Sequence, residues 1–163
     1  EKQIKQLYGL FMDSQSYLKN LENQLSITPQ VKFYDRKSDV ERLVQIIMRA
    51  GDMDALFNPA AAKAIMPGYY RTVPVKMKKD GIKFRGLLIN CLEAKIYKKL
   101  YNSPDHQIKI LPPHMRFSAG FIITKNAIYL IAYDNFQFSG IEIHNSFLAE
   151  THRAVFSELW SKC

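Results

Sequence analysis

Residues 119–160 read AGFIITKNAIYLIAYDNFQFSGIEIHNSFLAETHRAVFSELW, and this stretch decides the fold. Two runs within it, 119–124 and 127–133, are rich in β-branched and aromatic residues. Only Lys125 and Asn126 separate them, and a short polar break between two such runs is typical of a β-hairpin. The stretch therefore predicts two antiparallel strands joined by a tight turn.

A further strand and a helix are predicted after the hairpin. Gly140 to His144 is expected to form the strand. Asn145 or Ser146 can cap the helix that follows, from Phe147 to Ser161, because their side-chain oxygens accept hydrogen bonds from free backbone N–H groups. The expected buried face of that helix comprises Leu148, Val155, Phe156, Leu159 and Trp160.

Before the hairpin, strand and helix patterns alternate. The capping-box pattern Ser38-Asp-Val-Glu41 opens an amphipathic helix, and Gly51 stops it. Pro74 interrupts another helical pattern, so that helix is expected to be kinked or restarted. The order of the elements predicts an α/β fold in which helices cover a mixed sheet. The predicted strands are Val31–Tyr34, Met53–Phe57, Ile82–Ile89 and Ile108–Leu111, and the other predicted helices are Pro59–Met66, Tyr69–Lys79 and Leu92–Tyr101.

The N-terminal segment carries a heptad pattern. Apolar residues recur with alternating spacings of three and four, interrupted only by Ser14, which is the seam of a coiled coil. We expect a long helix that forms a homodimer through this seam, although an apolar face of this kind can also pack on its own domain. Pro29 ends the segment, which divides the chain into a dimerisation or linker helix, 1–28, and an α/β domain, 29–163. The seam residues are Ile4, Leu7, Phe11, Leu18, Leu21 and Leu25.

Composition indicates one globular domain with an appendage. The chain has 163 residues, 47% of them hydrophobic and 12% aromatic, without a low-complexity tract. Its net charge is +8, and the whole excess lies between Lys63 and Lys109, where eleven basic residues face three acidic ones. Such a segment is either an ordinary solvated surface or a surface that attracts nucleic acid or another anionic partner.

The remaining composition points to the cytoplasm. Cys91 and Cys163 lie far apart and form neither a disulfide framework nor a zinc motif, as is usual in a reducing compartment. No uninterrupted apolar run approaches the roughly 20 residues that cross a bilayer, so we expect no membrane contact. The chain begins at Glu1 rather than Met, and we therefore expect further sequence upstream.

A search for catalytic motifs finds none. A phospholipase D-type phosphodiesterase needs HxKxxxxD, since its histidine attacks phosphorus and its lysine holds the phosphoryl oxygens. Only His114-Met-Arg116 comes near this pattern, and Phe121 then occupies the Asp position. We therefore expect no catalytic residue, metal or cofactor, and thus a chain that is not an enzyme. The other histidines, His106, His144 and His152, belong to no motif, and Asp52 and Asp54 are expected in a solvated turn.

Aromatic and basic residues form the candidate ligand site. Arg and Tyr can bind a sugar or a small anion through directional donors above an aromatic floor. We expect these residues to lie together, with the alternative that Lys83 and Arg85 occupy a solvated strand face. The candidates are Tyr69, Tyr70, Arg71, Lys83, Arg85, His114 and Arg116.

Three segments of the chain resemble a known family. They are QVKFYDRKSDVERLVQII (30–47), DGIKFRGLLI (80–89) and the C-terminal run, in which a GIEIHNS strand precedes a helix of the form LAxxxRxxFxxLW. Together these patterns resemble the phospholipase D-like regulatory domain of TrmB-type transcriptional regulators. The resemblance implies a phospholipase D-like fold without its catalytic motif, behind an N-terminal winged helix that is not in these residues.

The resemblance implies an effector-sensing and dimerisation domain of a transcriptional regulator. DNA would then be bound by a part of the protein outside this chain, and a sugar-like or small anionic effector by the α/β domain. Two alternatives remain open. One is a phosphodiesterase or nuclease that uses His114 and Arg116, and the other is a module that binds nucleic acid directly through the basic middle third.

Overall fold

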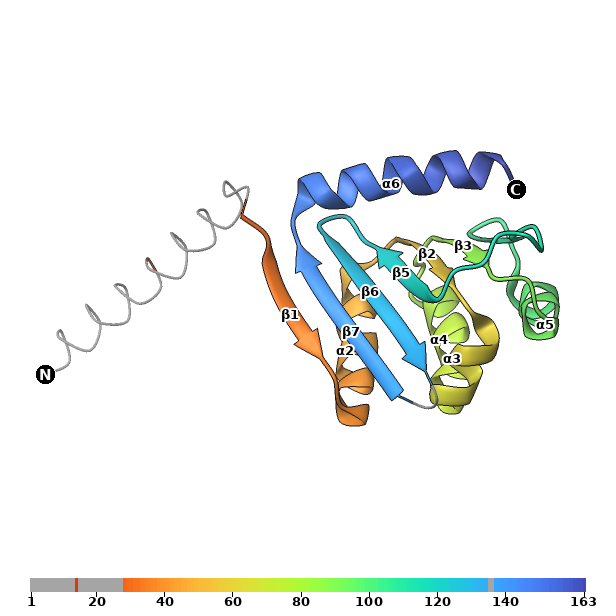
Figure 1. Ribbon diagram of the computed structural model, residues 1–163, viewed down its shortest axis with the longest axis horizontal. Coiled ribbons are helices and arrows are strands. Elements are labelled where there is room, and N and C mark those ends of the chain that lie inside the picture. The colour runs from red at the N-terminus through yellow and green to blue at the C-terminus, as the bar shows by residue number, and fades with distance from the viewer. Residues whose placement is uncertain (1–13, 15–27, 135–136) are drawn as a thin grey trace, which may run out of the picture.

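The computed structural model describes residue 14, residues 28–134 and residues 137–163. Its centre is a seven-stranded sheet of order β1-β7-β6-β5-β2-β3-β4 (Figure 1). The strands are β1 (Gln30–Tyr34), β2 (Met53–Phe57), β3 (Phe84–Leu88), β4 (His106–Ile110), β5 (Ala119–Ile123), β6 (Ala127–Asp134) and β7 (Gln137–His144). The helices are α2 (Lys37–Ala50), α3 (Pro59–Ile65), α4 (Pro67–Lys79), α5 (Leu92–Tyr101) and α6 (Ser146–Ser161). The expected mixed sheet covered by helices is confirmed.

The sheet has a parallel half and an antiparallel half. Strands β2, β3 and β4 are parallel, with helices in the crossovers between them, whereas β5, β6, β7 and β1 pair antiparallel. The halves join where β2 pairs antiparallel with β5. At this junction a Cβ on Gly120 would lie 2.6 Å from the Leu56 carbonyl oxygen, so only glycine fits there without a shift.

Helices cover the two faces unequally. Helix α6 crosses one face, while α2, α3 and α4 lie behind the sheet in the view of Figure 1. Each face has its own apolar cluster, and the one beneath α6 is mostly aliphatic. That cluster contains the fully buried residues Leu56, Leu87, Leu111, Ile123, Ile128, Ala149 and Phe156.

Most local predictions are confirmed. The hairpin pairs β5 with β6 across the Lys125-Asn126 break, and Asn145 caps α6 by accepting a hydrogen bond from the Leu148 N–H at 2.9 Å. Helix α2 ends at Gly51, whose φ of 88° lies in the left-handed region that favours glycine.

Several boundaries differ from the prediction, and those of α2, α4 and β7 are the most informative. Helix α2 begins at Lys37 because the Asp39 carboxylate accepts from the Arg36 N–H at 3.3 Å, which moves the capping box two residues upstream. Helix α4 restarts at Pro67, not at Tyr69, and continues through Pro74. A buried proline is tolerated there because the rest of α4 is held by packing on the sheet. Strand β7 begins at Gln137 and pairs along all of β6, so it is longer than predicted.

A buried acid ties the edge strand to its neighbour. Glu142 of β7 accepts hydrogen bonds from the Tyr34 hydroxyl of β1 and from His144 Nε2. Burial raises the pKa of the Glu142 carboxyl, but the two hydrogen bonds outweigh burial and leave the pKa lowered. Glu142 is therefore a charged acceptor at neutral pH and fixes β1 against β7.

The heptad seam and the predicted dimerisation helix fall outside the described residues, so both stay predictions from the sequence. In the part of the chain that the structure describes, no helix is long and apolar enough to cross a membrane.

Candidate functional site

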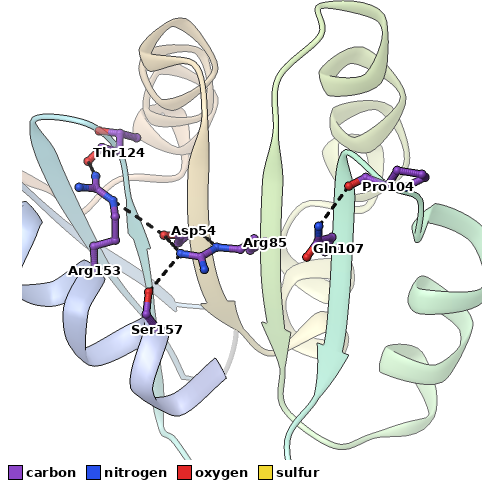
Figure 2. Close-up of polar contacts among 7 residues, drawn as sticks. All are labelled: Asp54, Arg85, Pro104, Gln107, Thr124, Arg153 and Ser157. Carbon is purple, nitrogen blue, oxygen red and sulfur yellow. Dashed lines mark hydrogen bonds and ion pairs between the residues drawn. The ribbon is translucent and has the colours of Figure 1, made fainter. Parts of the chain in front are cut away.

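A row of polar side chains crosses the parallel half of the sheet on the face that α6 covers. Asp54 of β2 pairs in register with Arg85 of β3, and Arg85 pairs with Gln107 of β4 (Figure 2). All three lie near the first residue of their strands, because β2, β3 and β4 start level with one another. The row therefore marks the amino edge of the parallel strands.

The centre of the row is a two-point ion pair. Arg85 Nε donates to Asp54 Oδ1 at 2.7 Å, and a terminal nitrogen of Arg85 donates to Oδ2 at 2.8 Å. The Asp54 residue is only 7% exposed. Its hydrogen bonds raise the pKa of the Arg85 guanidinium against the opposing effect of burial. A carboxylate this well buried is stable only because both of its oxygens have a charged donor.

Helix α6 closes over this pair. The Arg85 guanidinium carbon lies 5.2 Å from the ring centre of Phe156 and 5.7 Å from that of Trp160. Arg153 donates to the Thr124 carbonyl at 2.6 Å, and its Nε lies 3.9 Å from Asp54 Oδ2. The ion pair thus joins β2, β3 and α6 in one polar and aromatic contact.

A polar cleft of about 630 Å³ opens beside the row. Its lining contains the cations Lys83, Lys125 and Arg153 in addition to Arg85. Two of its acids have internal donors, since Asp54 binds Arg85 and Asp52 accepts the Lys83 backbone N–H at 2.8 Å. The cleft therefore offers positioned cations that suit an anionic group.

More cations gather along the same amino edge. Helices α2, α4 and α5 each return to the start of the next parallel strand, so their last turns lie at this edge. Basic side chains in those turns also complement the negative end of each helix dipole. They are Arg49, Lys76, Lys78, Lys79, Lys98 and Lys99. We call these residues, with Lys83, Lys125 and Arg153, the basic edge.

Many basic residues of the middle third lie at this edge. Lys76 is matched by Asp80 at 2.7 Å, whereas Lys78, Lys79 and Lys99 are exposed to solvent. The fold thus collects much of the excess positive charge found between residues 63 and 109 at one edge of the sheet.

The seven candidate ligand residues do not lie together, and this expectation is wrong. Lys83 and Arg85 line the polar cleft at the amino edge. Tyr69 and Tyr70 line an apolar cavity among α2, α4 and the opposite face of the sheet, and Arg71 is exposed on α4. His114 and Arg116 are exposed in the loop after β4, at the carboxyl edge. The prediction failed because adjacency in the sequence does not fix the edge at which a loop emerges.

Two residues of the site are not evident from the sequence. Asp54 lies on β2, where it is the partner of Arg85, and not in the solvated turn that we expect from its position. Arg153 belongs to the pattern of the last helix, in which nothing marks it as a site residue. A charged residue inside each of two neighbouring apolar strands is the available signal for the Asp54–Arg85 pair, because opposite charges on adjacent strands favour that register.

The histidines fill ordinary positions. His106 is buried, with Nε2 3.0 Å from the Ile82 carbonyl oxygen, and burial lowers its pKa. His152 Nδ1 lies 2.9 Å from the Leu148 carbonyl oxygen, one turn back along α6. Within the described ranges, no group of three His, Cys, Asp or Glu side chains is arranged to hold a metal ion.

Comparison with known proteins finds solved structures that share this fold. No protein-family model and no curated protein matches the chain. The solved structure of TrmBL2, an archaeal chromatin protein reported to show a novel mode of DNA binding, is 14% identical and aligns with a TM-score of 0.56. It matches over 99% of this chain, and the chain covers 65% of that protein.

Two further structures match the α/β domain. NucT from Helicobacter pylori is 12% identical with a TM-score of 0.63, over 83% of this chain and 98% of that one. Nuc from Salmonella typhimurium, a phospholipase D family member, is 14% identical with a TM-score of 0.59, over 82% and 95%. The chain therefore has a phospholipase D-like fold. The expectation that it is not an enzyme is contradicted, because this fold is shared with a phospholipase D family member.

The Asp54–Arg85 pair is expected to stabilise the fold far more than an exposed pair of equal length. In a double-mutant cycle with Asp54→Asn and Arg85→Met, urea unfolding should give a coupling of about 1.5 to 3 kcal/mol, since Asp54 is buried and the pair is doubly hydrogen-bonded. The matched control is Lys76 with Asp80, also 2.7 Å apart but exposed, for which we expect about 0.3 to 0.5 kcal/mol. Equal couplings would show that burial does not strengthen the Asp54–Arg85 contact.

Proposed function

We propose that this chain is the dimerisation and effector-sensing domain of a DNA-binding regulator. The observation that carries the proposal is the extent of the likeness to TrmBL2, which runs over 99% of this chain. The TrmBL2 structure is described as binding DNA, and this chain corresponds to 65% of it. A regulatory domain attached to a DNA-binding part would have this relation.

The position of the heptad segment supports a dimer. Strand β1 begins at Gln30, directly after Pro29, so the segment before it joins the chain at the edge of the sheet. A helix pair formed by two such segments would leave both α/β domains free to bind a ligand. The apolar seam would be buried between the two helices.

Charge in the seam is expected to separate the two copies. Leu18→Asp and Leu21→Asp each place a carboxylate where the seam excludes water, which costs free energy unless the carboxylate finds a partner. Native mass spectrometry should show a dimer for the unmodified chain and a monomer for either variant. Asn23→Asp lies on the outer side of the heptad and should leave the dimer intact. A dimer that survives both seam substitutions would refute this mode of association.

A second candidate is hydrolysis of a phosphodiester. The described α/β domain aligns with nearly the whole of NucT and Nuc, at 98% and 95% of their lengths. His114 and Arg116 lie in the loop after β4, at the carboxyl edge of the parallel strands, where open α/β sheets commonly bind ligands. The His114 imidazole would attack phosphorus and displace an alkoxide, Arg116 would hold the phosphoryl oxygens, and water would then release the phosphate from the histidine.

Hydrolysis can be tested directly with a chromogenic phosphodiester in the presence of a chelator. If His114 is the nucleophile, His114→Ala should abolish metal-independent release of the chromophore, whereas His152→Ala, on the outer side of α6, should not change it. Activity that is absent from the unmodified chain, or that is equal in both variants, would remove this candidate.

A third candidate is direct binding of nucleic acid, and the basic edge supports this function. Its cations lie at the amino edge of the parallel strands, and two of the three acids in the neighbouring cleft, Asp52 and Asp54, accept hydrogen bonds from internal donors. Phosphate contacts of this kind act independently of sequence and weaken with salt, because binding releases condensed counterions.

Affinity for duplex DNA should therefore fall steeply as salt rises. Replacing Lys83 and Lys125 by Gln should weaken binding for every sequence and reduce the log-log salt slope by about 1 for each phosphate that the variant no longer neutralises. Lys63→Gln is the control, because Lys63 lies on α3 at the opposite edge, 4.0 Å from Glu93. An unchanged slope in the double variant would exclude the basic edge as the DNA-binding surface, as would an equal reduction in the control.

A further inference from the structure

The apolar cavity behind the sheet differs in lining from the polar cleft, with which it shares Met53 and Phe84. It lies among helices α2 and α4 and strands β2, β5 and β6. Leu43 and Ile47 of α2 form one wall, and Val73 and Met77 of α4 form the other. Its volume is about 130 Å³.

Small side chains leave this space open. Ala55 on β2 and Ala62 on α3 both line the cavity and are almost fully buried, at 1% and 8% exposure. Protein interiors are ordinarily packed as densely as organic crystals, so the side chains around a gap of this size forgo part of their dispersion attraction. A guest molecule would restore that attraction.

The lining is uncharged and nearly all apolar. Four tyrosines are among the lining residues. Burial raises the pKa of Tyr70 and raises the pKa of Tyr133 to about 12, so both hydroxyls stay protonated at neutral pH. An apolar cavity of about 150 Å³ in another protein stays dry and binds benzene or xenon. The chemistry of this wall therefore selects an apolar guest.

A groove leads from the cavity toward solvent. It has a volume of about 690 Å³ and lies between α2 and α4. Val44, Met48, Tyr69 and Val73 line both the groove and the cavity, so the two spaces adjoin. The outer part of the groove is polar and contains Gln45, Arg49, Thr72, Lys76 and Asp80.

We propose that this cavity is the binding site for a small aromatic or branched aliphatic molecule, which enters through the groove between α2 and α4. The ligand's apolar body fills the space above Ala55, and one polar substituent points into the groove. That this molecule is the regulator's effector rests on the proposed function. That it binds in the cavity does not.

The position of α2 suggests how binding reaches the rest of the chain. A two-residue link, Asp35 and Arg36, joins α2 to β1, and β1 follows the heptad segment. A ligand between α2 and α4 therefore contacts the helix nearest in sequence to the predicted dimer seam. An effector in this cavity would therefore act first on α2.

Binding can be measured on the isolated chain with toluene as the probe. At a concentration ten times the dissociation constant, toluene should raise the melting temperature by about 3 to 6 °C. Methyl resonances of Ala55, Ile122 and Ile131 in the cavity should shift, and those of Leu87 and Ile128 beneath α6 should not. No rise in melting temperature, or methyl shifts on both faces of the sheet, would overturn the proposal.

A matched pair of substitutions locates the site. Val73→Phe fills the neck between groove and cavity and should reduce toluene affinity at least tenfold. Val155→Phe makes the same change on an exposed turn of α6, where Val155 is 64% exposed, and should leave affinity unchanged. Val44→Phe fills the neck from α2 and repeats the test if Val73→Phe does not fold. Equal affinity in the neck variant and the control would refute the site.

Dimer formation and ligand binding are distinguished by running both measurements on the same variants. If the Leu21→Asp monomer still binds toluene, the cavity site is supported and ligand binding does not depend on dimerisation. If native mass spectrometry shows a dimer but toluene does not raise its melting temperature, the cavity site is refuted and the proposed function still stands.

Discussion

The structure depends on the pairing of β2 with β5, since that pairing joins a parallel half-sheet to an antiparallel one. Only three residue pairs form it, Asp54 with Ile123, Ala55 with Ile122 and Leu56 with Phe121. Gly120 allows the backbones to approach at the end of this short ladder, where any side chain would meet the Leu56 carbonyl. Every larger feature follows from this junction, because it places the end of the hairpin beside the start of the parallel strands.

The junction also brings the polar residues together. Because Ile123 pairs with Asp54, the β5–β6 turn lies at the same edge of the sheet as Asp54 and Arg85. This turn contains Thr124 and Lys125. Helix α6 starts near that turn, and Arg153 in its second turn can reach both Thr124 and Asp54. A parallel strand in place of β5 would send its following loop to the other edge, and the cluster would lose two of its members.

The sequence pattern was sufficient for elements whose signals are local. The hairpin, β2 and α5 occur where predicted, since a polar break, an apolar run and a helical run each act within a few residues. The cluster around Asp54 was not predictable in this way, because its members come from β2, β3 and α6, far apart in the chain. The cavity was equally hidden, since it depends on how far α2 stands from α4 and not on the pattern of either helix.

The helices on the two faces of the sheet are held by different kinds of contact. On the α6 face, the Asp54–Arg85 ion pair lies beneath α6, and Arg85 contacts the Phe156 and Trp160 rings of that helix, so moving α6 would expose the charge of Asp54. On the other face, α2 and α4 contact the sheet through apolar side chains around an unfilled cavity, and Pro74 removes one backbone hydrogen bond from α4 at the cavity wall. Apolar contacts are not directional, so α2 and α4 can shift over the sheet without leaving a charge unpaired. A domain that responds to a small ligand is therefore expected to change at α2 and α4, together with the cations that these helices contribute to the basic edge, while the α6 face keeps the sheet in place.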